Sequence, residues 1–382
     1  MHEHKQNQCK RKVKHRKNVM RLIIFCITVG IAFMFIYYQN LRKEIYARQK
    51  WLETVLTGEK KWILENQGPE GEIYMNGSKA GDVNPYFACI AAQGLLAETK
   101  NCPMTETEKK AVGRYLDWHT GILLETDGKM GIYRKESGKL IYKEKADSED
   151  GYLGMYLFLM GKYLEKTEST DLPEYWKKGI SLALKKIQSL MQDGITQVSE
   201  ENTTAYLMDN LEVWKGLHEL ELAGLEDTQA ISEMRKKIQA QIEKTFWDDT
   251  NQRWRIIGNS DLYHQAEFYP DGVAQIYPLI YEFPVKEKKK QKILYDQFTE
   301  KFQWQKLNKK RTGFLWAMTG MAAAQMGDIN NLVELIGNYE AEYCENRKYP
   351  LYTGEAGWIC MECGKLYGLY ERKIKTGFIL CA

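Results

Sequence analysis

Hydrophobic positions divide most of the chain into two alternating kinds of helix. The first kind is apolar or built of small residues on nearly every side, which predicts burial on most faces. The second kind has an apolar stripe at helical spacing and a polar face, as in EKKKQKILYDQFTEKF. Helices of the first kind are expected to begin near Pro85, Asp150, Thr204, Pro270, Thr312 and Glu355. Helices of the second kind are expected over about 44–66, 105–118, 173–191, 228–246, 286–302 and 328–344.

This alternation predicts an all-α fold of the (α/α)6 toroid type, with an inner ring of buried helices inside an outer ring of half-exposed ones. The spacing between repeats is irregular, roughly 40 to 65 residues, which argues against a solenoid of identical units. One insertion, KMGIYRKESGKLIYKE over Lys129–Glu144, alternates in hydrophobicity around a polar turn. That pattern predicts a small β-hairpin.

A hydrophobic stretch near the N-terminus predicts a membrane anchor. Leu22–Tyr38 contains no charged residue and is about long enough to cross the hydrocarbon layer. Arg21 and the basic run Lys10–Lys17 precede it, so the N-terminus is expected in the cytoplasm. A cleaved signal peptide is the alternative, but no small-x-small site follows the stretch. The expected organisation is a cytoplasmic basic tail (1–21), a transmembrane anchor (22–38), an extracytoplasmic domain (39–372) and a tail without an assigned role (373–382).

Composition narrows the function. The chain has 382 residues, of which 44% are hydrophobic and 27% charged, as in a globular protein with a sizeable core. The net charge of +3 comes mostly from the N-terminal basic run, so it indicates topology and not a nucleic-acid partner. Cys360 and Cys363 form a C-x-x-C, but no second pair and no nearby histidine completes a zinc site. We expect no metal and no cofactor.

The loops before the inner helices carry the candidate chemistry. In such a toroid the inner helices run in one direction, so these loops meet at one end of the ring. They are rich in carboxylates and aromatic residues, a composition that suits sugars: rings stack on the sugar, and carboxylates accept hydrogen bonds from its hydroxyl groups. A carboxyl pair also cleaves glycosidic bonds. The candidate substrate-binding residues are Tyr86, Asp147, Glu149, Tyr152, Glu201, Asp209, Tyr269, Trp316, Glu355 and Trp358.

Three segments carry a resemblance to a known superfamily: NPYFACIAAQGLL (Asn84–Leu96), ADSEDGYLGMYLFL (Ala146–Leu159) and FYPDGVAQIYPLIY (Phe268–Tyr281). In these segments and in helix order the chain resembles the six-hairpin glycosidase-like superfamily, of which family-8 glycoside hydrolases are one branch. The resemblance covers nearly all of the extracytoplasmic region. It implies a catalytic acid in the loop that enters the first inner helix. The candidate catalytic residues are Glu72, Asp150 and Asp271.

Each candidate also has a purely structural interpretation. Asp147, Asp150 and Asp271 lie where acidic residues cap helices or stabilise the helix dipole. Asp209 lies inside an otherwise apolar helix, where it either faces the cavity or pairs with a buried partner. The two tryptophans can equally belong to the core of the ring.

Two functions follow from these patterns. The first is a membrane-anchored extracytoplasmic glycoside hydrolase-like protein that acts on cell-surface polysaccharide or exopolysaccharide. The second is a non-catalytic polysaccharide-binding or assembly protein of a polysaccharide export system. A toroidal cyclase or prenyltransferase fits poorly, because His264 with Cys360 or Cys363 is a thin zinc-ligand set. The expected partners are an oligo- or polysaccharide and the membrane, with no nucleic acid.

Overall fold

The computed structural model describes residues 2–77, 81–136, 139–169, 172–225, 228–258, 267–307 and 313–381. His264 lies outside these residues. The chain divides into two compact units. One consists of Met1–Trp51 with Tyr367–Ala382, and the other of Leu52–Leu366.

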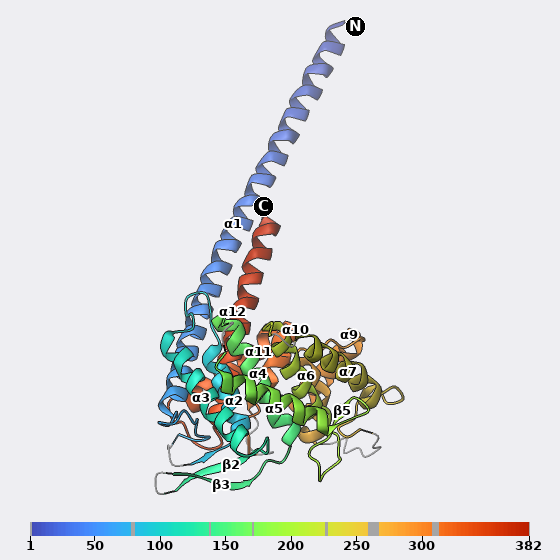
Figure 1. Ribbon diagram of the computed structural model, residues 1–382. Helices are drawn as coiled ribbons and strands as arrows, with labels where there is room; N and C mark the ends of the chain where they lie inside the picture. Colours follow the sequence, from blue (N-terminus) through green and yellow to red (C-terminus); the bar gives the residue numbers. More distant parts are fainter. Residues whose placement is uncertain are drawn as a thin grey trace. The chain divides into compact units, whose positions relative to one another are not determined.

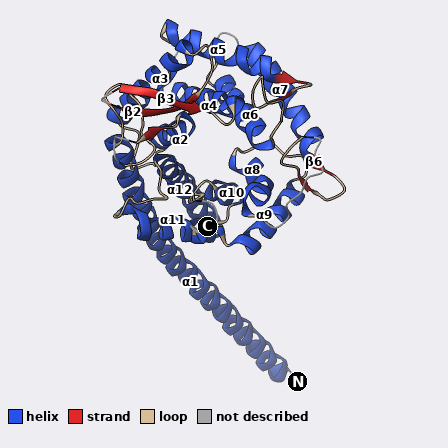
Figure 2. Cartoon of the chain, turned by 90° about the horizontal axis from the view of Figure 1, so that it is seen from below, coloured by secondary structure: helices blue, strands red, loops and turns tan. Residues whose placement is uncertain are grey.

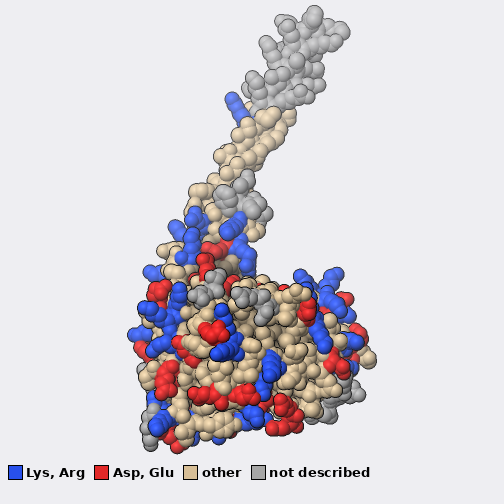
Figure 3. Space-filling view, in the orientation of Figure 1, with Lys and Arg blue, Asp and Glu red and all other residues tan. Residues whose placement is uncertain are grey.

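The first unit contains most of a long helix, α1 (His2–Glu65), which begins near the N-terminus (Figure 1). Of the helices in the described residues, this one is long and apolar enough to cross a membrane. Its apolar side chains are largely exposed, including Leu22, Phe25 and Phe33. Figure 3 shows this part of α1 as an uncharged stretch. The expected anchor therefore lies on a helix with the length and the apolar surface that a membrane span requires.

The second unit is a ring of helices within a ring of helices (Figure 2). In its described part, the inner helices are α2 (Pro85–Leu96), α4 (Glu149–Thr167), α6 (Leu207–Leu222), α8 (Val273–Ile280), α10 (Thr319–Met326) and the first part of α12 (Thr353–Cys381). The outer helices are the last part of α1, α3 (Glu106–Glu125), α5 (Glu174–Leu190), α7 (Thr228–Phe246), α9 (Lys288–Phe302) and α11 (Ile329–Tyr339). Each inner helix packs on the next, in the order predicted for the toroid.

Glycines let the inner helices touch backbone to backbone. A Cβ atom on Gly94 of α2 would lie 2.5 Å from Gly357 Cα of α12, so these two helices close the ring. A Cβ atom on Gly216 of α6 would lie 2.3 Å from the carbonyl oxygen of Gly154 on α4. Side chains at these positions would push the helices apart. This explains why the inner helices are built of small residues.

Polar residues fix where several helices begin. Thr105 and Glu108 form a capping box at the start of α3, as the sequence predicts. The side chain of Asn84 accepts a hydrogen bond from the backbone N–H of Tyr86 at the start of α2. Ser148 caps α4 by accepting from the N–H of Gly151. The last two caps also place polar side chains at the same end of the ring.

Short strands occupy loops between the helices. β1 (Asp82–Val83), β2 (Gly131–Glu136) and β3 (Lys139–Lys145) form an antiparallel sheet in that order. The hairpin of β2 and β3 is the one predicted from the alternating insertion. Two further hairpins join β4 (Met191–Gln192) to β5 (Ile195–Thr196) and β6 (Trp247–Asp248) to β7 (Arg253–Trp254). Three single turns complete the chain: η1 (Phe268–Gly272), η2 (Trp304–Lys306) and η3 (Glu340–Cys344).

The predicted helix positions are confirmed, with shifts at three inner helices. The fourth, α8, begins at Val273 after the turn η1, and not near Pro270. The third inner helix begins at Leu207 and not near Thr204, because Tyr206 is extended and forms a β-bridge with Ile257. The fifth begins at Thr319 and not near Thr312. Residues 313–318 form an irregular loop before it, and backbone N–H groups of this loop donate to the carboxylate of Glu355.

Candidate functional site

The N-terminal ends of all the inner helices border one cleft of about 1070 Å³. The sheet of β1, β2 and β3 contributes further lining residues. The acidic lining residues are Asp82, Glu144, Asp147, Asp209, Glu212 and Glu355. The aromatic ones are Tyr86, Phe87, Tyr152, Tyr206, Tyr269, Tyr277, Phe314, Trp316, Tyr352 and Trp358. Residues more than two hundred positions apart in the sequence thus share one surface.

Two carboxyl groups meet beside Gly151 of α4. A Cβ atom on Gly151 would lie 2.8 Å from Glu212 Oε2 and 3.5 Å from Asp209 Oδ1. Both oxygens lie within 3.5 Å of one point, so they are no more than about 7 Å apart. Both acids come from α6, three residues apart, which places them on one face of the helix. This upper limit on their separation falls within the spacing of carboxyl pairs that cleave glycosidic bonds, roughly 5–9.5 Å.

Three tyrosine hydroxyl groups hold the other oxygen of Glu212. Tyr86 and Tyr277 donate to Oε1 at 2.5 and 2.6 Å, and Tyr281 donates at 3.3 Å. Burial raises the pKa of Glu212 to about 8, although the tyrosine hydrogen bonds oppose the shift. At neutral pH this carboxyl group is therefore mostly protonated. With Oε1 occupied as an acceptor, the proton belongs on Oε2, beside Gly151 and the cleft.

Asp150, the residue before Gly151, is fully buried. Its carboxylate accepts hydrogen bonds from Ser148 Oγ (2.8 Å), the Gly151 N–H (3.0 Å) and Thr196 Oγ1 (2.7 Å). Burial raises its pKa to about 6, and these donors oppose the shift. Asp209 is affected in turn. Burial raises the pKa of Asp209 well above its usual range, and the Asp150 and Glu212 carboxyls raise it further.

Aromatic side chains form a continuous wall along the cleft. The rings of Tyr269 and Trp316 lie 4.7 Å apart between centroids. Phe314 stacks on Phe87 at 5.7 Å and contacts Tyr352 at 5.5 Å. Aromatic faces present large, rigid apolar surfaces at little entropic cost, so this wall suits a flat ligand with apolar faces.

The cleft includes most of the residues predicted for substrate binding. Those that line it are Tyr86, Asp147, Tyr152, Asp209, Tyr269, Trp316, Glu355 and Trp358. Asp147 is exposed on the cleft surface, whereas Trp358 is almost fully buried. Glu355 is also buried, and burial raises its pKa to about 7 against three opposing backbone hydrogen bonds.

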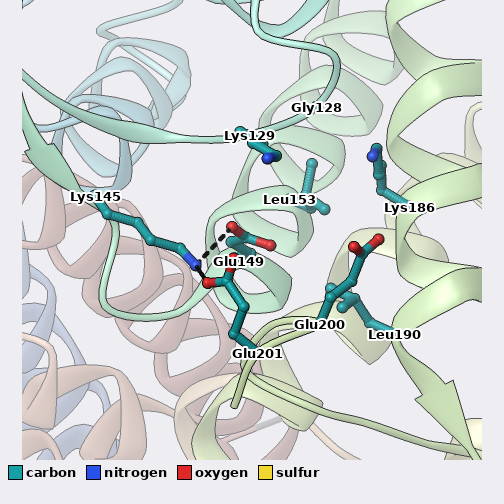
Figure 4. Close-up of a pocket in the computed structure, with 9 residues that line it drawn as sticks. All are labelled: Gly128, Lys129, Lys145, Glu149, Leu153, Lys186, Leu190, Glu200 and Glu201. Carbon is teal, nitrogen blue, oxygen red and sulfur yellow. Dashed lines mark hydrogen bonds and ion pairs between the residues drawn. The ribbon is translucent and has the colours of Figure 1, made fainter. Parts of the chain in front are cut away.

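Glu149 and Glu201 belong to a different place. They line a separate cavity of about 20 Å³ together with Lys129, Lys145 and Lys186 (Figure 4). Lys145 Nζ pairs with Glu149 at 3.3 Å and with Glu201 at 2.5 Å. The cavity has room for about one water molecule. These two acids are therefore engaged in ion pairs, and they do not border the large cleft.

Glu72 and Asp271 also lie outside the cleft lining. The Glu72 side chain turns into the domain, where it accepts from the Tyr74 hydroxyl (2.8 Å) and the Glu70 N–H (3.0 Å). Lys135 Nζ lies 3.9 Å from it. Asp271 is buried in the turn that leads into α8. Proximity to an inner helix in the sequence does not by itself direct a side chain into the cleft.

Sequence reasoning missed Glu212, the acid with the clearest chemical environment. The residues expected on this helix lie before it or in its first turn, as Asp209 does, whereas Glu212 lies one turn further into α6. Its signal was the i, i+3 spacing from Asp209 on a helix that is otherwise mostly apolar there. Tyr277 and Tyr281, which hold Glu212, were missed for the same reason.

In the described ranges, no three His, Cys, Asp or Glu side chains are arranged to hold a metal ion. Cys360 and Cys363 are buried in α12. His264 is not among the described residues. The absence of a metal cofactor stays a prediction.

Comparison with known proteins identifies the fold. No protein-family model matches the sequence, and no curated protein matches it either. A solved glycosidase, crystallised as a single-residue variant, superposes with a TM-score of 0.60 at 12% identity, covering 86% of this chain and 98% of the other. An inactive variant of α-1,6-mannanase from a Salegentibacter species, bound to α-1,6-mannotetrose, gives 0.54 at 10% identity, covering 83% and 99%.

The second unit is an (α/α)6 toroid, the fold of these two enzymes. This confirms the fold predicted from the sequence. The toroid also superposes on a type II terpene cyclase from Scytonema, with a TM-score of 0.53 at 11% identity, covering 85% of this chain and 99% of the cyclase. At such identities the likeness establishes the fold alone. The function must be argued from the cleft of this toroid.

Proposed function

We propose that the toroid binds an oligo- or polysaccharide in the large cleft and hydrolyses one of its glycosidic bonds. One observation carries the proposal. Glu212, whose pKa is raised to about 8 by burial, lines the same cleft as the exposed carboxyl group of Asp147. The aromatic wall beside it supports a sugar ligand. The glycosidases and the mannotetrose-bound mannanase of the same fold support the same reaction class.

The geometry supports Glu212 as the general acid. It gives its proton to the oxygen of the departing sugar as the bond from that oxygen to the anomeric carbon breaks. Asp147, which is exposed and lines the same cleft, is the proposed base. It takes a proton from the water whose oxygen bonds to the anomeric carbon. The reaction then balances, with one water consumed and two sugar ends produced.

Asp150 has a supporting role in this proposal. Its negative charge is held in place by three donors. That charge favours the protonated form of Glu212. Glu72 and Asp271, which do not line the cleft, take no part in the proposed step.

We also propose that the toroid works outside the cytoplasm on cell-surface polysaccharide or exopolysaccharide. Residues 22–38 of α1 would span the membrane, with the basic residues 1–21 in the cytoplasm. The apolar, exposed surface of this part of α1 supports the anchor.

Reducing-end release from a panel of polysaccharides tests the proposal. The panel holds β-linked glucans, α-1,6-mannan and bacterial exopolysaccharides. We expect release with at least one member, and its loss in Glu212→Gln and Asp147→Asn. Glu201→Gln is the matched control, because it removes a carboxyl outside the cleft. Binding without release from any polymer would favour the non-catalytic binding or assembly protein.

A further inference from the structure

Trp316 has a backbone conformation that its side chain disfavours. Its φ is +59°, in the left-handed region where residues with a Cβ atom are strained. Residues held in this region persist only where the surrounding structure imposes the conformation, and they cluster at ligand sites. Trp316 lines the cleft. Contacts from neighbouring residues must therefore fix the loop 313–318 in this conformation.

Glu355 is the group that holds it. Its Oε1 accepts from the N–H groups of Leu315 and Trp316, both at 3.1 Å, and its Oε2 accepts from the N–H of Ala317 at 2.9 Å. One buried carboxylate thus accepts from three consecutive N–H groups around the strained residue. The carbonyl of Trp316 is also engaged, since Thr319 Oγ1 donates to it at 2.8 Å.

The conformation of this loop decides where the indole ring lies. The Trp316 ring packs against the rings of Tyr269 and Phe268, with centroids 4.7 and 5.6 Å apart. Phe314, two residues earlier in the same loop, contacts the indole at 6.1 Å. If the loop relaxed, the indole would leave Tyr269 and the aromatic wall would be broken.

We propose that Glu355 is a positioning residue, which controls sugar binding by holding Trp316 on the aromatic wall and not by contacting the sugar. This inference rests on the proposed function only in taking the ligand to be a saccharide. It changes the interpretation of Glu355, which the sequence suggests as a direct substrate contact. It also assigns Trp316 and Tyr269 to one binding platform whose integrity depends on α12.

Amide hydrogen exchange of the full-length chain in detergent tests the positioning step without any ligand. In Glu355→Ala we expect the segment 313–318 to exchange at least tenfold faster, while segments of α6 are unchanged. Glu355→Gln keeps the size of the side chain and one acceptor oxygen, so its exchange should be intermediate. Unchanged exchange of 313–318 in Glu355→Ala would overturn the proposal.

A double-mutant cycle tests the link to binding. The probes are α-1,6-mannotetrose and cellotetraose, together with any oligosaccharide cut from a positive polymer, and the readout is Kd by calorimetry. Trp316→Ala and Glu355→Ala should each weaken binding by about tenfold or more, and the double variant should be no weaker than Trp316→Ala alone. Additive effects would mean that Glu355 contacts the sugar itself and would overturn the proposal.

The two hypotheses fail in different ways. If the wild type cleaves no polymer but the exchange and binding results hold, the hydrolase proposal fails and the positioning role stands. If cleavage is found but the KM of Glu355→Ala is unchanged, the positioning role fails and the hydrolase proposal stands.

Discussion

The two ends of α6 each bury a glutamate, but the pKa of one is raised and that of the other is lowered. Glu212, near its N-terminal end, has tyrosine hydroxyls and other acids around it, and burial raises its pKa to about 8. Glu219, two turns further on, is also buried, and burial again acts to raise its pKa. There, however, Lys215 and Lys162 approach at 2.8 Å and lower the pKa below its ordinary value.

The ion pairs at this second end continue across the ring. Lys215 also pairs with Glu282, which follows α8, at 3.1 Å. Glu282 in turn pairs with Lys365 of α12. Glu219 and Glu282, which connect helices, thus have cationic partners. In the described part of the chain no ion pair is found for Glu212 or Asp209, although Asp82 and Glu144 at the edge of the cleft do form ion pairs. The difference separates a region whose ion pairs stabilise the ring from the region in which we propose proton transfer.

Glutamine variants of Glu212 and Glu219 should show the largest difference between the two ends of α6, one in activity and the other in stability. Glu212→Gln should lower polysaccharide cleavage by a factor of about 10² to 10⁴, the usual contribution of a general acid. It should not destabilise the fold at pH 7, because the wild-type fold keeps this carboxyl group protonated above its ordinary pKa, and glutamine removes the free-energy cost of doing so. Glu219→Gln should instead destabilise the fold by about 2 kcal/mol, since buried Lys215 and half-buried Lys162 each lose one charged partner and keep only Glu282 and Glu165. Reducing-end release and urea denaturation measure the two effects.

The opposite outcome would be informative. An active Glu212→Gln protein would remove the general acid from the account. A Glu219→Gln protein as stable as wild type would show that the lysine network contributes nothing to the ring.

Alanine variants of two glycines on α4 sharpen the comparison. A Cβ on Gly151 meets only side-chain oxygens, of Glu212 at 2.8 Å and Ser148 at 2.9 Å. Gly151→Ala should therefore displace the carboxyl cluster and lower activity about tenfold or more with a small change in Tm. A Cβ on Gly154 meets the α6 backbone, 2.7 Å from Val213 N. Gly154→Ala should lower Tm more, by forcing α4 and α6 apart. Equal Tm losses in both variants would contradict this distinction.

A further expected effect is the dependence of stability on pH. The pKa of Glu282 in the folded state, about 2, lies below its unfolded value of 4.5. Its stabilising contribution is present above pH 4.5 and is lost as pH falls toward 2. Glu212 has the opposite effect, because its pKa in the folded state is raised to about 8. Between pH 4.5 and 8 its carboxyl group ionises in the unfolded chain but stays protonated in the folded one. The free energy of unfolding therefore falls as pH rises through this range. Denaturation across pH 2–9 should show both slopes. Glu212→Gln should lessen only the loss of stability between pH 4.5 and 8, because the raised pKa values of Asp150, Asp209 and Glu355 still contribute to it.

Much of the fold could be predicted from the sequence, because helix formation depends on residues that are close together in the chain. Helix periodicity predicts both rings, and the common direction of the inner helices predicts that Asp147, Asp209 and Trp316 share a cleft. Side-chain direction is not local. Glu72 turns inward to Tyr74, and Glu212 becomes an acid only because tyrosines from α2 and α8 surround it. The contact of Glu355 with the Trp316 loop depends on a backbone angle that no residue pattern reveals.

The central claim is that Glu212 carries a proton at neutral pH. Infrared difference spectra between wild type and Glu212→Gln measure this directly, through the carbonyl band of a protonated carboxyl. We predict a band in the wild type at pH 7 that titrates away with an apparent pKa near 8. A carboxyl that is already ionised at pH 5 would contradict the account.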